Sequence, residues 1–334
     1  MYKQNMIFYL MLLMSILLTI SSSSWLGLWL SLEINLLSII PLMSNIKNLY
    51  SVEASLKYFL IQVLASIIMI YTMISMSLEF MIMKLDYLSY SMMLNMSLLT
   101  KLGSAPFHFW LPEIMNGLSW MNAFLMLTIQ KIPTLIIISY NNYENFMFFI
   151  IMLNLMVGGL MGLNQTSMRK ILAYSSITHL GWILSTILMF QKISIYYMII
   201  YMIIMYNIII ILNSLNIFNL TQLMHSFNNK TMKLMFIFNM LSLMGLPPFL
   251  GFFPKWLTIQ YLMMNNWYML IIMMITVNMI TMYYYMKILS NLMIFENNKM
   301  NYYFSHNINQ KKIIMMNLIS ILLLFIMPMI LNFI

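Results

Sequence analysis

An apolar run of the chain is interrupted by Lys101-Leu-Gly-Ser-Ala-Pro-Phe-His-Phe-Trp-Leu-Pro-Glu113, and a second by Gly245-Leu-Pro-Pro-Phe-Leu-Gly-Phe-Phe-Pro-Lys255. Proline removes a backbone hydrogen bond from a helix and clashes with the preceding turn, and glycine weakens the same stretch. Both segments are therefore predicted to be broken helices. The alternative is a pair of ordinary proline kinks, but kinks alone do not explain why a lysine stands beside each.

The composition identifies the medium in which these apolar runs lie. The 334 residues are 63% hydrophobic, 15% aromatic and only 7% charged. A soluble domain carries about 25% charged residues to cover its surface, so a soluble enzyme, a disordered chain and a fibrous repeat are excluded. Cysteine is absent from the sequence, which excludes disulfides, iron–sulfur clusters and Cys-ligated zinc. The predicted class is an all-α polytopic membrane protein.

Segments long and apolar enough to span a bilayer number about eleven. They lie near 5–20, 26–43, 57–75, 87–102, 120–140, 146–163, 171–190, 194–215, 232–261, 267–288 and 313–333. The first, preceded by Lys3, resembles a secretory signal, but no small-x-small cleavage site follows, so a retained helix is predicted. The longest polar stretch, 295–312, is predicted to be a linker.

The distribution of basic residues predicts the orientation of these helices. The net charge is +9, and the basic residues are scattered singly rather than gathered in a stripe for nucleic acid. If successive helices alternate in direction, one side collects Lys3, Lys47, Lys57, Arg169, Lys170, Lys230, Lys233, Lys287, Lys299, Lys311 and Lys312, and the other only Lys84 and Lys192. The positive-inside rule then places the N-terminus inside and, for an odd number of spans, the C-terminus outside.

Four further charged residues fall within or beside the apolar segments: Glu33, Lys101, Lys131 and Lys255. A charge at the bilayer centre costs about 2.5–3.5 kcal/mol on insertion scales, and such residues usually mark an ion or proton path. Snorkelling to the interface is the alternative for Lys101 and Lys255, and a structural ion pair with Lys101 is the alternative for Glu33. Lys131 is predicted to lie near the middle of its helix, where snorkelling is difficult.

The spacing of the two interrupted stretches predicts an internal repeat. They fall in the fourth and ninth predicted helices, five helices apart. Because successive helices alternate in direction, this odd separation predicts that the two units are inverted relative to each other. Matched interruptions of this kind indicate the working centre of a transporter with inverted repeats. The predicted organisation is a first five-helix repeat over 1–143, an inverted repeat over 144–290, and a linker with a C-terminal helix over 291–334.

At these residues the chain resembles the subunit 2 family of mitochondrial NADH dehydrogenase (ubiquinone), the respiratory complex I, over essentially its whole length. The resemblance rests on both interrupted stretches and on Ser31-Leu-Glu-Ile-Asn-Leu-Leu-Ser-Ile-Ile-Pro41, Gly117-Leu-Ser-Trp-Met-Asn122 and Gln130-Lys-Ile132. The strings Leu-Gly-Ser-Ala-Pro-Phe-His-Phe-Trp and Gly-Leu-Pro-Pro are quite specific to this subunit. The 44 methionines resemble the product of an AT-rich invertebrate mitochondrial gene.

The resemblance implies an antiporter-like fold in the membrane arm, in the short mitochondrial form that lacks the first three helices of bacterial relatives. It implies the mitochondrial inner membrane, with the N-terminus in the matrix and the C-terminus in the intermembrane space. It also assigns the proton path to Glu33, Lys101, Lys131 and Lys255. The second repeat has no carboxylate that matches Glu33, and His179 is the titratable residue in its place.

These residues suggest a mechanism. Burial destabilises the charged form of a lysine, and a nearby carboxylate stabilises it. Movement of Glu33 relative to Lys101 would then switch the affinity of the lysine for a proton, with Lys131 as relay and Lys255 exchanging protons with the far side. His108 and His179 are candidate relays through water, although His108 fits a structural role equally well.

No cofactor or metal is predicted to bind this chain itself. A Gly-x-Gly-x-x-Gly fingerprint is absent, and His108 and His179 have no partners at a convincing spacing for haem. The resemblance implies that NAD, FMN, iron–sulfur clusters and ubiquinone belong to the parent complex. The expected partners are the other membrane-arm subunits and lipid, including cardiolipin, but not nucleic acid. Two other interpretations stay open: a stand-alone cation/proton antiporter, and a structural subunit whose charges only specify helix packing.

Overall fold

The structure, a computed structural model, describes residues 2–45, 47–82, 87–141, 143–227, 230–294 and Asn317. Within these residues the regular elements are helices, joined at one point by an isolated β-bridge between Ser167 and Asn219. The chain forms two compact units, Met1–Asn154 and Leu155–Ile334. Their boundary falls inside a helix, somewhat beyond the predicted repeat boundary at 143. The inverted relation between the repeats stays a prediction.

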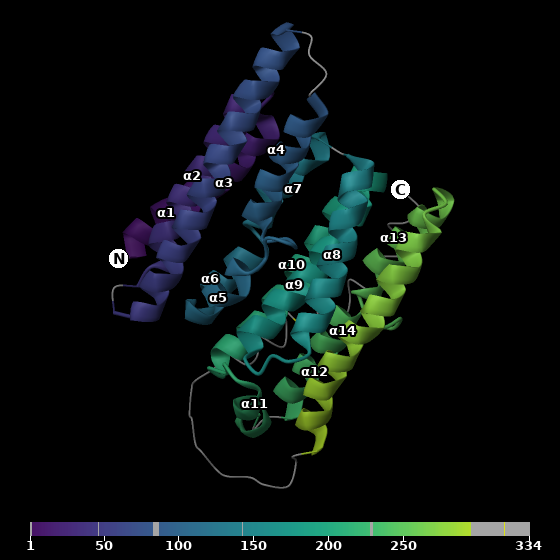
Figure 1. Cartoon of the computed structure of the whole chain (residues 1–334). Coiled ribbons are helices and arrows are strands. Elements are labelled where there is room, and N and C mark those ends of the chain that lie inside the picture. Colours follow the sequence, from purple (N-terminus) through teal and green to yellow (C-terminus); the bar gives the residue numbers. More distant parts are fainter. Residues whose placement is uncertain are drawn as a thin grey trace. The chain divides into compact units, whose positions relative to one another are not determined.

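The first unit is built from seven helices and the start of an eighth (Figure 1). They are α1 (Tyr2–Ser21), α2 (Trp25–Met43), α3 (Leu49–Ile82), α4 (Tyr87–Leu102), α5 (Trp110–Gly117), α6 (Trp120–Leu127), α7 (Lys131–Tyr140) and α8 (Glu144–Gly162) as far as Asn154. The long α3 packs against both α4 and α5, while α1 packs along α2 and also contacts α7. Helix α2 also contacts α3 and α7, and α4 contacts α7, so that α2, α3, α4 and α7 surround one interior.

The second unit continues from the end of α8 through six more helices of the described chain. They are α9 (Met168–Met189), α10 (Gln191–Ser214), α11 (Leu220–Ser226), α12 (Lys230–Met244), α13 (Phe252–Met264) and α14 (Tyr268–Ile294). Helix α13 packs against α9, α10 and α14, and α12 packs against α10 and α14. The short α11 was not predicted; it starts with a capping box formed by Asn219 and Gln222.

The helices have the length and composition of a multi-pass membrane protein. Seven of the described helical spans are long and apolar enough to cross a bilayer, and α1 contributes a shorter apolar stretch, Asn5–Ser21. The first ten predicted spans each coincide with one helix or with a broken pair of helices. The eleventh, 313–333, lies outside the described residues except for Asn317, so the total of eleven stays a prediction.

Both predicted breaks are present, and a glycine of positive φ directly follows the end of the helix before each break. Helix α4 ends at Leu102 and α5 begins at Trp110, while α12 ends at Met244 and α13 begins at Phe252. The next residues are Gly103, with φ of 69°, and Gly245, with φ of 77°. Glycine adopts this left-handed conformation without steric cost, which makes it the usual residue just after the end of a helix.

A third break lies between α6 and α7. The span predicted over 120–140 is confirmed as one apolar stretch of 21 residues, and the break inside it was not predicted. Pro133 has no N–H for the carbonyl of Ile129, four residues earlier, and proline fits most readily in the first turn of a helix, where no such bond is needed. The helix therefore restarts at Lys131, so that Pro133 falls within the first turn of α7. Lys131 thus stands at a helix start rather than in the middle of a continuous helix.

Candidate functional site

The three intramembrane lysines all lie next to helix breaks, and all are enclosed by protein. Lys101 is in the last turn of α4, Lys131 opens α7, and Lys255 is in the first turn of α13. Their exposed fractions are 8%, 2% and 5%. Because their side chains are buried within their own units, these lysines do not extend along the surface as snorkelling would require.

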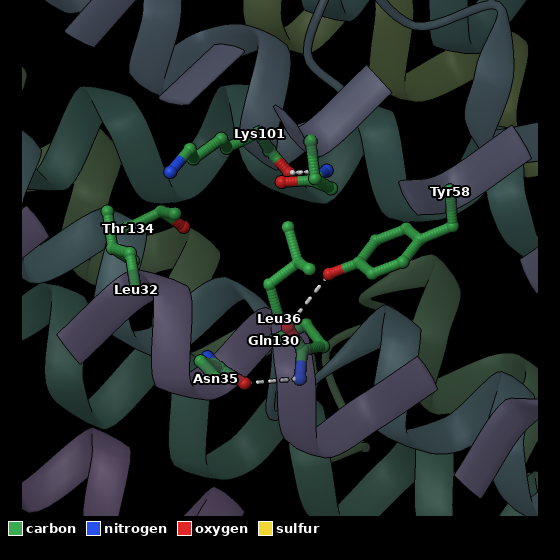
Figure 2. A pocket seen from close by; sticks show the side chains of 8 residues that line it. Leu32, Asn35, Leu36, Tyr58, Lys101, Gln130 and Thr134 are labelled. Atoms are coloured by element: carbon green, nitrogen blue, oxygen red, sulfur yellow. Dashed lines mark hydrogen bonds between the residues drawn. The ribbon is translucent and has the colours of Figure 1, made fainter. Parts of the chain in front are cut away.

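In the first unit, Lys101 borders a small cavity with room for roughly one water molecule (Figure 2). Helices α2, α3, α4 and α7, together with the residue before α7, supply its walls. The lining residues are Leu32, Asn35, Leu36, Tyr58, Gln62, Lys101, Gln130 and Thr134. The cavity is therefore lined on several sides by polar groups that can hold a water molecule.

A chain of hydrogen bonds fixes the polar side of this cavity (Figure 2). The Tyr58 hydroxyl donates to Gln130 Oε1 at 3.2 Å, and Gln130 Nε2 donates to Asn35 Oδ1 at 2.7 Å. Gln62 Nε2 donates to the backbone carbonyl of Lys101 at 3.3 Å, which satisfies a carbonyl at the end of α4. The network positions Gln130, which directly precedes Lys131.

Sequence reasoning gave no role to Asn35, Tyr58, Gln62 or Gln130. A signal was available, because Asn35 and Gln62 are amides within apolar helices, and a buried polar group needs a hydrogen-bond partner. The identity of the partners was not available, since pairing depends on which helices become neighbours.

Glu33 lies close enough to Lys101 and Tyr58 for its charge to act on both. In the described residues it nevertheless makes no ion pair with Lys101. Its Oε1 atom is buried and has no hydrogen-bond partner there. The structure thus brings the predicted pair into electrostatic range but leaves the two groups apart.

Lys131 occupies a different electrostatic environment from Lys101. It is the first residue of α7, and its backbone carbonyl accepts a hydrogen bond from Thr134 Oγ1 at 2.9 Å. The N-terminal end of a helix carries a partial positive charge, which disfavours an ammonium group. Thr134 also lines the cavity beside Lys101, so the start of α7 connects the surroundings of the two lysines.

In the second unit, the Lys255 side chain reaches back across its own break. Its Nζ atom donates to the carbonyl oxygen of Met244 at 2.9 Å and to Asn278 Oδ1 at 2.7 Å. The same atom lies 5.5 Å from the centre of the Trp182 ring. The ammonium group is thus stabilised by three neighbours: the negative C-terminal end of α12, an amide oxygen and the face of an aromatic ring.

The two candidate histidines have different surroundings. His108 is buried in the segment between α4 and α5, where Nδ1 lies 3.2 Å from the carbonyl oxygen of Pro106. His179 is on α9, where Nδ1 lies 2.9 Å from the Tyr197 hydroxyl and the ring centre lies 5.0 Å from that of Tyr201. His108 belongs to the same unit as Glu33, Lys101 and Lys131, whereas His179 shares the second unit with Lys255.

Comparison with known proteins identifies the family. Residues 22–281 match the sequence model of the family described as NADH:quinone oxidoreductase/Mrp antiporter, TM. The chain is 42% identical over 310 residues to NADH-ubiquinone oxidoreductase chain 2 of Anopheles gambiae, covering 92% of this chain and 91% of the relative. It is 43% identical over 334 residues to the protein of the same name from Aedes aegypti, covering 98% and 97%.

A solved structure supports the same fold. A chain of respiratory complex I from Thermus thermophilus superposes with a TM-score of 0.84 at 21% identity, covering 97% of this chain and 79% of that one. The sequence resemblance is thereby confirmed, and the insect relatives agree with the invertebrate character of the methionine-rich composition. The chain belongs to the NADH:quinone oxidoreductase/Mrp antiporter transmembrane family and, within it, to the NADH-ubiquinone oxidoreductase chain 2 proteins.

Proposed function

We propose that this chain is a core membrane-arm subunit of NADH:ubiquinone oxidoreductase, respiratory complex I, and contributes to the proton translocation that electron transfer from NADH to ubiquinone drives. The observation that carries the proposal is the burial of three lysines at three helix breaks in an antiporter-family fold. Other subunits hold NAD, FMN, the iron–sulfur clusters and ubiquinone. The asymmetry of basic residues supports an N-terminus in the matrix and a C-terminus in the intermembrane space of the mitochondrial inner membrane.

Glu33 and Lys101 form the switch of this mechanism. A buried carboxylate that approaches Lys101 stabilises its ammonium form, and a carboxylate that withdraws favours loss of the proton. Glu33 has the freedom to make this movement because its buried Oε1 atom is held by no hydrogen bond in the described residues. The electrostatic influence of Glu33 on Lys101 without a closed ion pair supports this role.

Lys131 receives the proton that Lys101 releases. The water-sized cavity beside Lys101 is lined by Gln130, which directly precedes Lys131, and by Thr134, in the first turn of α7. A water molecule in this cavity would accept hydrogen bonds from the amide and hydroxyl groups and shorten the path between the two amines. The Tyr58–Gln130–Asn35 network keeps this wall of the cavity in place.

Lys255 exchanges the proton with the far side in the second unit. Its ammonium form is held by the carbonyl oxygen of Met244 and by Asn278. A carbonyl oxygen accepts but cannot donate, so the charged form benefits most from this arrangement. Release of the proton therefore requires the end of α12 or the Asn278 side chain to move.

A purely structural subunit is the second candidate function, and the contacts of Lys255 favour it most. Its ammonium group satisfies carbonyls at the end of α12, which is also what a packing role requires. A stand-alone antiporter is the third, since the family also includes Mrp antiporters. The three candidates differ in whether the chain enters a large complex and whether loss of a lysine impairs assembly or coupling.

The test is a Lys101→Met variant of the chain in the assembled complex, compared with Lys57→Met. Lys57 is exposed on α3 and pairs with Glu53 at 2.9 Å, so its loss should affect neither assembly nor translocation. Native gels stained for NADH dehydrogenase activity report assembly, and reconstituted vesicles report protons moved for each NADH oxidised. The proposal expects normal assembly with impaired translocation for Lys101→Met alone. Migration of the unmodified chain as a small separate complex contradicts it.

A further inference from the structure

One side chain of α8 holds the break between α4 and α5. The backbone N–H of Ala105 donates to Asn154 Oδ1 at 2.6 Å, and both residues are fully enclosed within the first unit. Ala105 follows Lys101 by four residues and precedes His108 by three. This hydrogen bond therefore fixes the backbone between the two titratable side chains of the break. The proton path described above does not include Asn154.

Nearby hydrogen bonds fix the end of α4 to the break from within the same stretch of chain. Ser104 donates to the Leu99 carbonyl from its backbone N–H and from its hydroxyl, both at 3.1 Å. The ring nitrogen of Trp110 donates to the Thr100 carbonyl, also at 3.1 Å. The bond of Ala105 differs from these, because its acceptor lies 49 residues further along the chain. It therefore joins the break to a separate helix.

The Ala105 N–H and the Lys101 carbonyl are the two halves of one missing helical hydrogen bond. In a continuous helix the N–H of residue 105 would donate to the carbonyl four residues earlier, which is that of Lys101. Here the Lys101 carbonyl accepts from Gln62 Nε2 at 3.3 Å, while the Ala105 N–H donates to Asn154. An amide of α3 and an amide of α8 thus replace the bond that the break removes at Lys101.

Asn154 is the single polar side chain in a long apolar part of α8. From Phe146 to Leu163 every other residue is apolar or glycine, and Ile150 and Ile151 beside it are buried. Burial of an amide in such surroundings is unfavourable unless the amide forms hydrogen bonds. The Asn154 Nδ2 atom is buried and has no hydrogen-bond partner in the described part of the chain. The contribution of this side chain is therefore its oxygen, which the Ala105 N–H occupies.

We propose that Asn154 is a positioning residue for proton translocation, an inference that rests on the function proposed above. Through Ala105 it keeps the chain open directly after α4 and so fixes Lys101 relative to Glu33 and the cavity. Asn154 itself carries no proton. Without its oxygen the buried Ala105 N–H is unpaired, and the backbone of the break shifts toward another acceptor. Lys101, four residues away on the same backbone, shifts with it.

The test is Asn154→Leu in the assembled complex, with Asn95→Leu as the matched control. Asn95 is also fully enclosed, and its Nδ2 atom donates to the Asn141 carbonyl at 3.1 Å. It lies on α4 six residues before Lys101, away from the break. Both variants exchange a buried amide for an apolar side chain of similar size and lose a hydrogen bond. Both should therefore lower the melting temperature of the complex.

Translocation should distinguish the two variants. We expect the rate to fall by about tenfold in Asn154→Leu alone, since a displacement of about 1 Å can slow a positioned reaction by about a hundredfold. The pH profile of translocation should also shift in Asn154→Leu, because it reports on Lys101 with the neighbouring Glu33 of α2 and Tyr58 of α3. A rate and a pH profile equal to those of Asn95→Leu overturn the proposal.

A Lys101→Met variant measured in parallel separates this inference from the proposed function. If Lys101→Met stops translocation while Asn154→Leu does not, the positioning role is overturned and the proposed function stands. If Lys101→Met translocates normally, the proposed function fails, and the role of Asn154 in translocation fails with it.

A map of the variant complex tests the positioning directly. The Lys101 side chain should be displaced in Asn154→Leu and should keep its place in Asn95→Leu; an undisplaced Lys101 in Asn154→Leu contradicts the proposal. If Asn154→Leu does not assemble, Asn154→Ala, which adds no bulk, takes its place in every measurement. If neither variant assembles, Asn154 serves folding alone and the proposal is overturned.

Discussion

The Nζ atom of Lys255 lies 2.9 Å from the carbonyl oxygen of Met244, on the opposite side of the break that separates α12 from α13. The charged side chain of Lys255 therefore links the end of α12 to the start of α13 across the break in the backbone. A cation at the C-terminal end of a helix is stabilised by the helix dipole and by carbonyls that lack helical partners. The same contact couples the position of α12 to the proton on Lys255.

Replacement of Lys255 by methionine removes this contact and leaves the Met244 carbonyl and the Asn278 amide without their donor. An unpaired buried polar group costs about 1–3 kcal/mol, so the assembled complex should unfold at a lower temperature and also lose translocation. Lys192→Met, at an exposed site at the start of α10, is the control for both measurements. An unchanged melting temperature would show that the contact adds nothing to stability.

Gly245 should tolerate no side chain. Its φ of 77° is unfavourable for other residues, by about 1–2 kcal/mol, and an added Cβ would lie 2.8 Å from Lys255 Cδ. Gly245→Ala is therefore expected to destabilise the break and to displace Lys255 from Met244, which lowers translocation as well as the melting temperature. The accompanying measurement is the Lys255 position in a map of the variant complex. Normal stability with Lys255 in place contradicts this expectation.

Gln130 and Asn35 should behave as one unit. Because Gln130 Nε2 donates to Asn35 Oδ1 at 2.7 Å, Gln130→Leu leaves the buried Asn35 amide without its donor, and Asn35→Leu leaves the half-buried Gln130 nitrogen without its acceptor, whereas the double variant removes both amides. The expected coupling is about 0.5–3 kcal/mol in a double-mutant cycle on thermal unfolding. If Gln130 positions Lys131, Gln130→Leu also shifts the pH profile of translocation, which a purely structural role would leave in place. Strictly additive effects would show that the two side chains act independently.

Glu33→Gln separates charge from packing at the switch. Oε1 of Glu33 has no hydrogen-bond partner in the described residues, so an amide of the same shape should cost little stability. Removal of the charge, however, removes the electrostatic influence on Lys101, and translocation should fall while assembly stays normal. Glu113→Gln on α5 is the matched control, since Glu113 is exposed and forms a surface pair with Lys57 at 3.4 Å. Equal translocation by the two variants would contradict the switch.

The sequence was sufficient for those features of the fold that local chemistry determines. Gly103 and Gly245 predicted the ends of α4 and α12, because helix termination by glycine depends on the backbone alone. Pro133 was overlooked, since proline is compatible with the first turn of a helix and its neighbours are as apolar as any transmembrane segment.

The sequence predicted which charged residues form the candidate site, but not which side chains surround and bond them. The charges of Glu33, Lys101, Lys131 and Lys255 mark them directly, because a charge in an apolar segment is rare. The hydrogen bonds of Gln130 with Tyr58 and Asn35 join residues far apart in the chain. Such contacts arise only when α2, α3 and α7 pack together, and one sequence does not specify that packing.

The most direct measurement is the number of protons translocated for each NADH oxidised by complex that contains Lys131→Met, reconstituted in vesicles and quantified by native gel. Lys131 is 2% exposed and begins α7 at the unpredicted break. The account predicts complex in normal amounts with a reduced proton ratio, because the relay between Lys101 and the second unit is missing. An unchanged ratio in fully assembled complex would contradict the proton-path account, and a loss of assembly without loss of coupling would instead support the structural alternative.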